Sequence, residues 1–439
     1  MRKIFYPFIG VLAAVLLLTS CSQSAPPPTQ EDDMGTTTPT LDATVFPTST
    51  IAATPTDADT QKTIRIWHAW DEPYVPALVE IISNFQEINP NVHFDVLYIP
   101  GENLLERYIE EARAGAGPSL LLGPAEWGAI LYDEGLIDDL DDKFDVDVFE
   151  RFNPAALNQM RYKDAIMGLP YQIDGVVMFR NGSIIPESAD TFDELVSLAQ
   201  SFSQGEIIGA VLDRGFFFSG GHLDGVGGSL MDEDGNPAFN DPQGVEWINL
   251  LIDFELVGPT TYLSERDQEL FQAGSIGIII DGTWNTELHA EAIGKENLVI
   301  DPWPVYGDGS LSGYVRAEDQ FLNSQLSANN LDITLEFMQY FSSPDAQTIL
   351  AAAGMIPAVT DLQLVGDINQ RHTTQAIIAL AGGSAYPALP EMTVYLAPMD
   401  VALRSVFDLG VAPEIALQTA EDMIIIELEN FWAARTPTP

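Results

Sequence analysis

The sequence predicts an α/β fold in which strands and helices alternate along the chain. Residues 276–280, Ile-Gly-Ile-Ile-Ile, form a short β-branched run between glycine turns, which is typical of a strand buried on both faces. Such strands belong to parallel or mixed sheets that helices cover. Residues 63–96 have the strand, helix, strand spacing of a βαβ unit. A chain of 439 residues, 46% hydrophobic, can bury a sizeable core in two or three domains.

The composition narrows the class of partner. Lys and Arg number 18 against 65 Asp and Glu, for a net charge of −47, which disfavours binding to a nucleic-acid backbone. An acidic surface that keeps the protein soluble, or that is adapted to salt, is the simplest explanation of this charge. Five His and one Cys offer little for a zinc site, and no disulfide can form within one chain. We therefore expect neither a metal nor a cofactor.

The first 20 residues have the features of a lipoprotein signal peptide. A basic start is followed by an apolar stretch, Ile4–Leu18, that is short for a membrane-spanning helix. The segment Leu18-Thr19-Ser20-Cys21 resembles a bacterial lipobox, which makes Cys21 the expected site of lipid attachment. An ordinary cleaved signal peptide with a chance cysteine is the alternative. Residues 21–62 are rich in Pro, Thr and Ser and are expected to form a disordered tether, and 433–439 a disordered tail.

The first half of the folded chain places polar and aromatic side chains directly after predicted strands. The apolar periodicities predict strands at 63–67, 91–96 and 119–122 and helices at 74–88 and 103–114. Trp70 and Asp71 follow the first strand, and Glu126 and Trp127 follow the third. Ligands of open α/β sheets bind beyond the carboxyl ends of the strands, so these four side chains are candidate ligand contacts.

The second half repeats this arrangement. Strands are predicted at 207–211 and 298–301, and helices at 191–202, 243–256, 264–272, 331–341 and 413–431. Arg214 and three consecutive phenylalanines follow the strand at 207–211; we interpret at least one of these rings, Phe217 first, as a wall of a binding site. Asp281 and Trp284 follow the strand at 276–280. Burial in the core remains an open alternative for Phe217 and Trp284.

Several segments resemble one protein family. FQAGSIGIIIDGTW at 271–284, WHAWDEP at 67–73, FQEINPNV at 85–92 and DEGLIDDL at 133–140 resemble, in order and spacing, the extracellular solute-binding proteins of ABC sugar importers, the maltose-binding-protein-like family. The likeness covers residues 63–432. Two departures are Gly117-Pro118-Ser119, where the family usually has Pro-Asp, and Arg180-Asn181, where it has Tyr-Asn.

The resemblance implies a two-lobed periplasmic-binding-protein-like fold of the class II type, with the ligand cleft between the lobes. Lobe 1 would comprise residues 63–178 and 304–341, and lobe 2 residues 179–303 and 342–432. It also implies that the segment containing Tyr171 and Asp174 lies in the cleft, that an aromatic near Tyr395 faces the ligand, and that Trp284 stacks on a sugar ring.

Sugars present C–H faces that stack on aromatic rings and hydroxyl rims that need directional partners. The expected stacking residues are Trp70, Trp127, Trp284 and Tyr395, with Phe217 weaker, and the expected hydroxyl partners are Asp71, Glu126, Asp174, Asp281 and Arg214, with Tyr171 beside them.

The resemblance predicts a monomeric receptor, lipid-anchored on the extracytoplasmic face of the bacterial cell membrane. It would capture a carbohydrate, first a di- or oligosaccharide, and deliver it to the permease subunits of an ABC importer. A polyamine or another small cation is the alternative ligand that the acidic composition allows. The chain lacks a Gly-x-Ser-x-Gly elbow, a Walker loop, His-Glu-x-x-His and Cys-x-x-Cys, and we predict no enzyme. A secreted glycoside hydrolase acting on a polysaccharide is the alternative, because hydrolysis needs only two spaced carboxylates. A surface lipoprotein without a ligand is a third reading. The order of the motifs favours the receptor.

Overall fold

The computed structural model describes residues 62–255 and 264–435. The predicted signal peptide, Cys21 and the tether up to residue 61 lie outside the described residues. Residues 433–435, expected in a disordered tail, instead continue the last helix. None of the helices within the described ranges combines the length and apolarity that a membrane crossing would need.

The core of the fold is a mixed ten-stranded sheet with the order β2-β1-β3-β12-β6-β8-β7. β1 runs parallel to β2 and β3, and β7 runs parallel to β8, whereas β12 is antiparallel to both β3 and β6. Short strands complete it: β13 and β9 pair with β6, and β14 pairs with β12. The main strands are β1 Lys62–His68, β2 Val92–Tyr98, β3 Leu120–Pro124, β6 Leu169–Asn181, β7 Ile208–Val211, β8 Ile276–Gly282 and β12 Tyr314–Leu322, and the short ones β9 Leu298–Asp301, β13 Ile356–Pro357 and β14 Ser384–Ala385.

Two small hairpins stand apart from this sheet. β4 (Arg161–Tyr162) pairs with β5 (Ala165–Ile166), and β10 (Val305–Tyr306) pairs with β11 (Gly309–Ser310).

One strand is shared by the two halves of the sheet. β6 is 13 residues long; up to Gly175 it pairs with β12, and from Val176 onward it pairs with β8 and β9. The predicted strand buried on both faces is confirmed as β8, in which every residue is buried.

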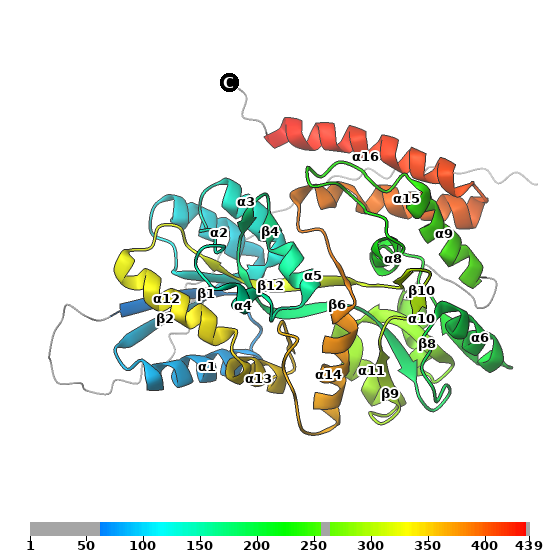
Figure 1. Cartoon of the computed structure of the whole chain (residues 1–439), viewed down its shortest axis with the longest axis horizontal. Helices are drawn as coiled ribbons and strands as arrows, with labels where there is room; N and C mark the ends of the chain where they lie inside the picture. The colour runs from blue at the N-terminus through cyan, green and yellow to red at the C-terminus, as the bar shows by residue number, and fades with distance from the viewer. Residues whose placement is uncertain (1–61, 256–263, 436–439) are drawn as a thin grey trace, which may run out of the picture. The chain divides into compact units, whose positions relative to one another are not determined.

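Helices flank the sheet on both sides (Figure 1). α1 contacts α12 and α13, and α16 contacts α9 and α15. The longer helices are α1 Val75–Ile88, α2 Gly101–Arg113, α6 Phe192–Phe202, α9 Pro242–Glu255, α10 Ser264–Gln272, α11 Thr286–Ile293, α12 Ala328–Phe341, α13 Pro344–Ala352, α14 Ile368–Ala381, α15 Leu396–Leu409 and α16 Pro413–Arg435. Shorter helices are α3 Gly128–Asp133, α4 Val146–Phe149, α5 Pro154–Gln159, α7 Phe216–Ser219, α8 Gly221–Gly225 and the 3₁₀ turns η1 Ala125–Trp127, η2 Thr283–Asn285 and η3 Pro390–Val394.

Local sequence signals explain most of these elements. Thr191 and Glu194 form the predicted capping box at the start of α6, and the Asp241 side chain accepts from the backbone N–H of Gly244 at the start of α9. The phenylalanines at 216–218, expected in a turn, instead open α7. The strand β12, at the centre of the sheet, was not predicted, and neither were α14 and α15.

Candidate functional site

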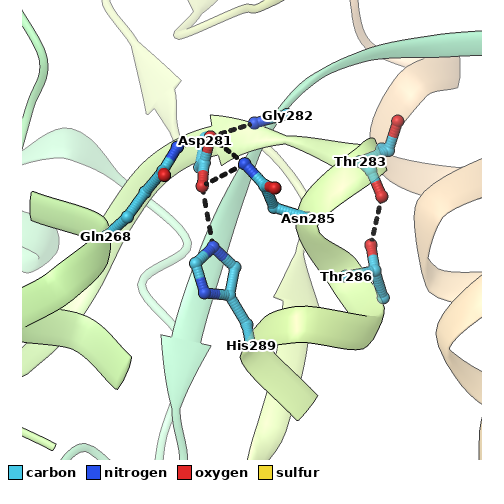
Figure 2. Close-up of polar contacts among 7 residues, drawn as sticks. All are labelled: Gln268, Asp281, Gly282, Thr283, Asn285, Thr286 and His289. Carbon is cyan, nitrogen blue, oxygen red and sulfur yellow. Dashed lines mark hydrogen bonds and ion pairs between the residues drawn. The ribbon is translucent and has the colours of Figure 1, made fainter. Parts of the chain in front are cut away.

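The turn after β8 is organised by the carboxylate of Asp281 (Figure 2). It accepts hydrogen bonds from the backbone N–H of Gly282 and from the side-chain amides of Gln268 and Asn285, and it lies 2.7 Å from Nε2 of His289. The Asp281 side chain is 1% exposed. A buried carboxylate with this many partners fixes the turn from β8 into η2 and α11. Asp281, predicted to bind ligand hydroxyls, is therefore a structural residue.

This turn presents the indole of Trp284 to solvent. Trp284 is 51% exposed, so the alternative that it belongs to the core is wrong. The ring folds back over Gly282, where a Cβ atom would lie 2.1 Å from the indole. Thr283 Oγ1 accepts from the N–H of Gly175, which ties the turn to β6. Trp284 is thus an exposed aromatic surface on a fixed backbone.

The turn after β3 has the same construction. β3 leads into η1 and then α3, as β8 leads into η2 and α11. The indole of Trp127 lies over Gly123, where a Cβ atom would lie 2.3 Å from the ring. Trp127 is partly exposed. Two indoles, Trp284 half exposed and Trp127 partly exposed, therefore follow two strands of one sheet.

The strands between these turns carry charged side chains on one face. Arg316 of β12 pairs in register with Asp174 of β6, and its Nε lies 3.1 Å from Glu126 Oε1 of η1. Burial raises the pKa of Asp174, and the charge of Arg316 opposes this shift. Oδ1 of Asp174 and Oε2 of Glu126 are buried and have no hydrogen-bond partner among the described residues. Such atoms usually have a partner, so these two oxygens are unsatisfied hydrogen-bond acceptors within the described residues.

Aromatic rings continue from Trp284 toward this charged face. The ring centroids of Phe217 and Trp284 are 6.2 Å apart, those of Phe217 and Tyr386 5.9 Å, and those of Tyr386 and Tyr314 5.3 Å. Phe217 and Tyr386 are partly exposed. Phe217 is thus in contact with Trp284 and Tyr386, and its role as a wall of a binding site stays a prediction.

A cavity of about 370 Å³ lies beside the charged face, beyond the ends of β1 and β3. Trp70, Asp71, Trp127, Tyr171 and Glu318 are among its lining residues. Trp70 is buried, and its indole Nε1 donates to the Tyr171 hydroxyl over 2.8 Å. The structure therefore brings four of the predicted residues together in one cavity.

A larger cavity, of about 560 Å³, lies elsewhere on the same body. It is lined by α5, the β4–β5 hairpin and residues 229–234 and 385–389, and it includes Tyr314 and Tyr386. Neither Trp127 nor Trp284 lines it. The candidate site comprises the smaller cavity, which Trp127 lines, and the adjoining charged face, whose buried carboxylate oxygens have no partner among the described residues. Trp284 joins it through the contact with Phe217.

Two further predicted residues lie away from this site. Tyr395 is fully buried and donates to the carbonyl of Gly235 over 2.7 Å, so it belongs to the core rather than to a ligand surface. Arg214 is buried, binds Glu255 over 2.9 Å, and lies 4.5 Å from the ring of Phe407. Both side chains are held by neighbours of their own.

Three contributors to the site were missed: Arg316, Glu318 and Tyr386. The first two lie on β12, where Tyr314, Arg316 and Glu318 alternate with the apolar Val315 and Ala317. This period of two is a strand signal that would have placed both charges on one face. No comparable sequence signal marks Tyr386, which follows the two-residue strand β14.

Comparisons with known proteins agree on one family. Residues 80–376 match the family model described as bacterial extracellular solute-binding protein. The maltotriose-binding protein of Pyrococcus abyssi is 24% identical over 228 residues, covering 51% of this chain and only 49% of that relative. A maltooligosaccharide ABC transporter solute-binding lipoprotein of Streptococcus pneumoniae is 21% identical, covering 87% of this chain and 92% of the relative.

The solved structures agree on the fold. An extracellular solute-binding protein from Staphylococcus aureus, in complex with maltose, superposes with a TM-score of 0.74 at 20% identity, covering 85% of this chain and 99% of the other.

Proposed function

Because this chain belongs to the bacterial extracellular solute-binding protein family, we propose that it captures an oligosaccharide outside the cell and delivers it to an ABC importer. Its fold is the two-lobed fold of periplasmic binding proteins. The proposed lobes comprise residues 63–178 with 304–341, and 179–303 with 342–432, and the cleft between them holds the ligand. The proposal extends to a monomer in solution.

One observation carries this proposal. Buried carboxylate oxygens of Asp174 and Glu126 lack hydrogen-bond partners among the described residues, and the partly exposed indole of Trp127 and the half-exposed indole of Trp284 lie in the neighbouring turns. Sugar hydroxyls would supply the missing donors, and the C–H faces of the sugar rings would stack on the indoles. The other members of the proposed site are Trp70, Asp71, Tyr171, Phe217, Arg316 and Tyr386.

Isothermal titration calorimetry with neutral oligosaccharides, maltotriose first, tests the proposal. We expect a Kd in the micromolar range or below for at least one sugar, and a stabilisation of about 2.7 kcal/mol at a hundredfold excess over Kd. Asp174→Asn should weaken binding by about tenfold or more, because it removes a charged acceptor worth about 1.5–3 kcal/mol. Asp95→Asn, on the exposed side of β2, is the matched control. Absence of binding across both neutral and amino sugars of one to seven units would refute the proposal.

A binding role without hydrolysis is part of the same proposal. The glycoside hydrolase alternative predicts shortened products when the sugar is incubated with a stoichiometric amount of protein. We expect chromatography to return the sugar intact after prolonged incubation. Any enzyme-dependent cleavage that disappears in Glu126→Gln or Asp174→Asn would favour the hydrolase.

Attachment to the extracytoplasmic face of the membrane is proposed from the lipobox-like segment at Cys21. Cys21→Ser should move the protein from the detergent-extracted membrane fraction into the soluble extracytoplasmic fraction. A variant that still needs detergent for its release would count against a lipid anchor at this residue.

A further inference from the structure

The cavity of about 370 Å³ has an uneven chemical lining. Its aromatic walls are Trp70, Tyr74, Trp127 and Tyr171. Among the described residues that line it, the acidic ones are Asp71 and Glu318, and no Lys, Arg or His is present. Aromatic faces combined with carboxylates and without a competing cation are the surroundings that stabilise an organic ammonium group.

A relay of hydrogen bonds orients Glu318 in this cavity. The indole N–H of Trp70 donates to Tyr171 Oη over 2.8 Å, and the hydroxyl of Tyr171 donates to Oε2 of Glu318 over 3.4 Å. The relay engages one oxygen of the carboxylate. Oε1 makes no hydrogen bond within the described residues and is available to a donor from a ligand.

The charges around Glu318 also favour a cation. Asp174 of β6 and Glu126 of η1 act on it as negative neighbours, and Asp319 adjoins it on β12. Arg316 is the positive neighbour, but its Nε already binds Glu126 over 3.1 Å. Burial, followed by the charges of Asp174 and Glu126, raises the pKa of Glu318 to about 8. At neutral pH the side chain is therefore mostly protonated in the protein alone, and a bound cation would favour its ionised form.

We propose that this cavity binds the ammonium group of an amino sugar, so that Glu318 and Asp71 pair with the charge while Trp70 and Trp127 stack against it. The proposal rests on the proposed carbohydrate-binding function and names its substrate class. A neutral hydroxyl in the same place would gain neither the ion pair nor the cation–π contact. Ionisation of Glu318 on binding would release a proton to the solvent.

Two pairs of probes that differ at the 2-position test the proposal. D-glucosamine is compared with D-glucose, and the β-1,4-linked glucosamine disaccharide with cellobiose, so that an ammonium group replaces each 2-hydroxyl. At pH 7, calorimetry should give at least tenfold tighter binding of the amino sugars. Titrations in buffers with different ionisation enthalpies should show release of about one proton per amino sugar. Equal affinities within a pair, tighter binding of the neutral sugar, or no binding of the amino sugars would each overturn the proposal.

A variant pair separates the cavity from the general sugar site. Glu318→Gln keeps the shape of the side chain and should remove both the amino-sugar preference and the proton release. Glu336→Gln, at an exposed position of α12, is the matched control and should retain both. A preference that persists in Glu318→Gln would also overturn the role of this residue. Tight binding of neutral oligosaccharides alone would leave the receptor function intact and reject only the amino-sugar assignment.

Discussion

The indole of Trp284 lies over the backbone of Gly282, in space that a β-carbon at that position would occupy. A Cβ atom there would be 2.1 Å from the ring, although the backbone itself, with φ of −82°, suits any residue. The glycine is therefore needed for the position of the indole and not for the conformation of the turn. A substitution at Gly282 can therefore change the orientation of the Trp284 indole while the ring itself is kept.

Gly282→Ala should displace the indole and weaken oligosaccharide binding by about tenfold, with a small change in stability, because the anchor remains but its orientation is lost. Calorimetry and denaturant unfolding on one sample measure both quantities. The control is Gly382→Ala, where φ is −93° and the new Cβ would meet its nearest neighbours at an ordinary 3.7 Å. Equal affinities for the parent and Gly282→Ala would show that the ring position is unimportant.

Trp284→Ala should weaken binding by more than about tenfold, as expected for truncation of an aromatic anchor worth about 2 kcal/mol or more. Because half of the side chain is already exposed, its removal should lower the free energy of unfolding by less than about 1 kcal/mol. A buried tryptophan would instead cost about 3–5 kcal/mol. Normal binding by a strongly destabilised variant would show that Trp284 contributes to stability and not to ligand binding.

Asp281→Ala, in contrast to Trp284→Ala, should chiefly lower the free energy of unfolding. The substitution leaves the amides of Gln268 and Asn285 and the ring of His289 without their shared acceptor in a buried position. The expected loss of unfolding free energy is about 3 kcal/mol, since each buried group left unsatisfied costs about 1–3 kcal/mol. Denaturant unfolding measures it. A stability equal to that of the parent would contradict the assignment of Asp281 as the centre of the turn.

His68 should make a contribution to stability that is lost as the pH is lowered from about 6.5 to 4. Burial lowers the pKa of His68 to about 4, whereas the unfolded chain takes up the proton near 6.5, so protonation of this residue favours unfolding across this window. Nδ1 of His68 accepts from the N–H of Trp70 over 3.1 Å, so the ring is neutral in this arrangement. Buried His222 adds a second loss of the same sign.

His68→Asn keeps an acceptor for the N–H of Trp70 and removes the titration. Between pH 6.5 and 4 it should lose about 3 kcal/mol less unfolding free energy than the parent, at about 1.4 kcal/mol per pH unit. Urea unfolding at a series of pH values gives the comparison. Parallel pH profiles for the parent and the variant would mean that His68 titrates at its ordinary pKa in the folded protein.

The sequence alone predicts an element correctly where one local signal dominates. The apolar run at 276–280 was predicted as a strand buried on both faces because β-branched residues between glycines allow few other structures. The boundaries of α10, 264–272, agree for the same reason: helical composition ends at a glycine turn. Trp70, Asp71 and Trp127 were identified as candidates from their places after strands, and the structure brings them into one cavity.

The burial and role of other residues depend on tertiary contacts that cannot be read from the sequence. Tyr395 is fully buried because α15 and α16 pack against η3, the segment that precedes it. Trp284 lies in η2, which contacts β6 and α11, and its indole is half exposed. Arg214 could not be separated from a ligand residue until its ion pair with Glu255 was known. β12 was overlooked because three charged residues in a central strand contradict ordinary strand composition.

The partner exchange within β6 has a mechanical consequence. At Gly175 the strand pairs with β12, and one residue later Val176 pairs with β8, so the two halves of the sheet are joined by an unbroken ribbon instead of a loop. A Cβ atom at Gly175 would lie 2.5 Å from the carbonyl oxygen of Tyr314, which fills the space on that side. A rotation of one half of the sheet against the other would therefore twist β6. The hydrogen bonds that β6 makes with its neighbouring strands would oppose this twist. A continuous strand with ladders on both sides resists twisting more than a loop of the same length would.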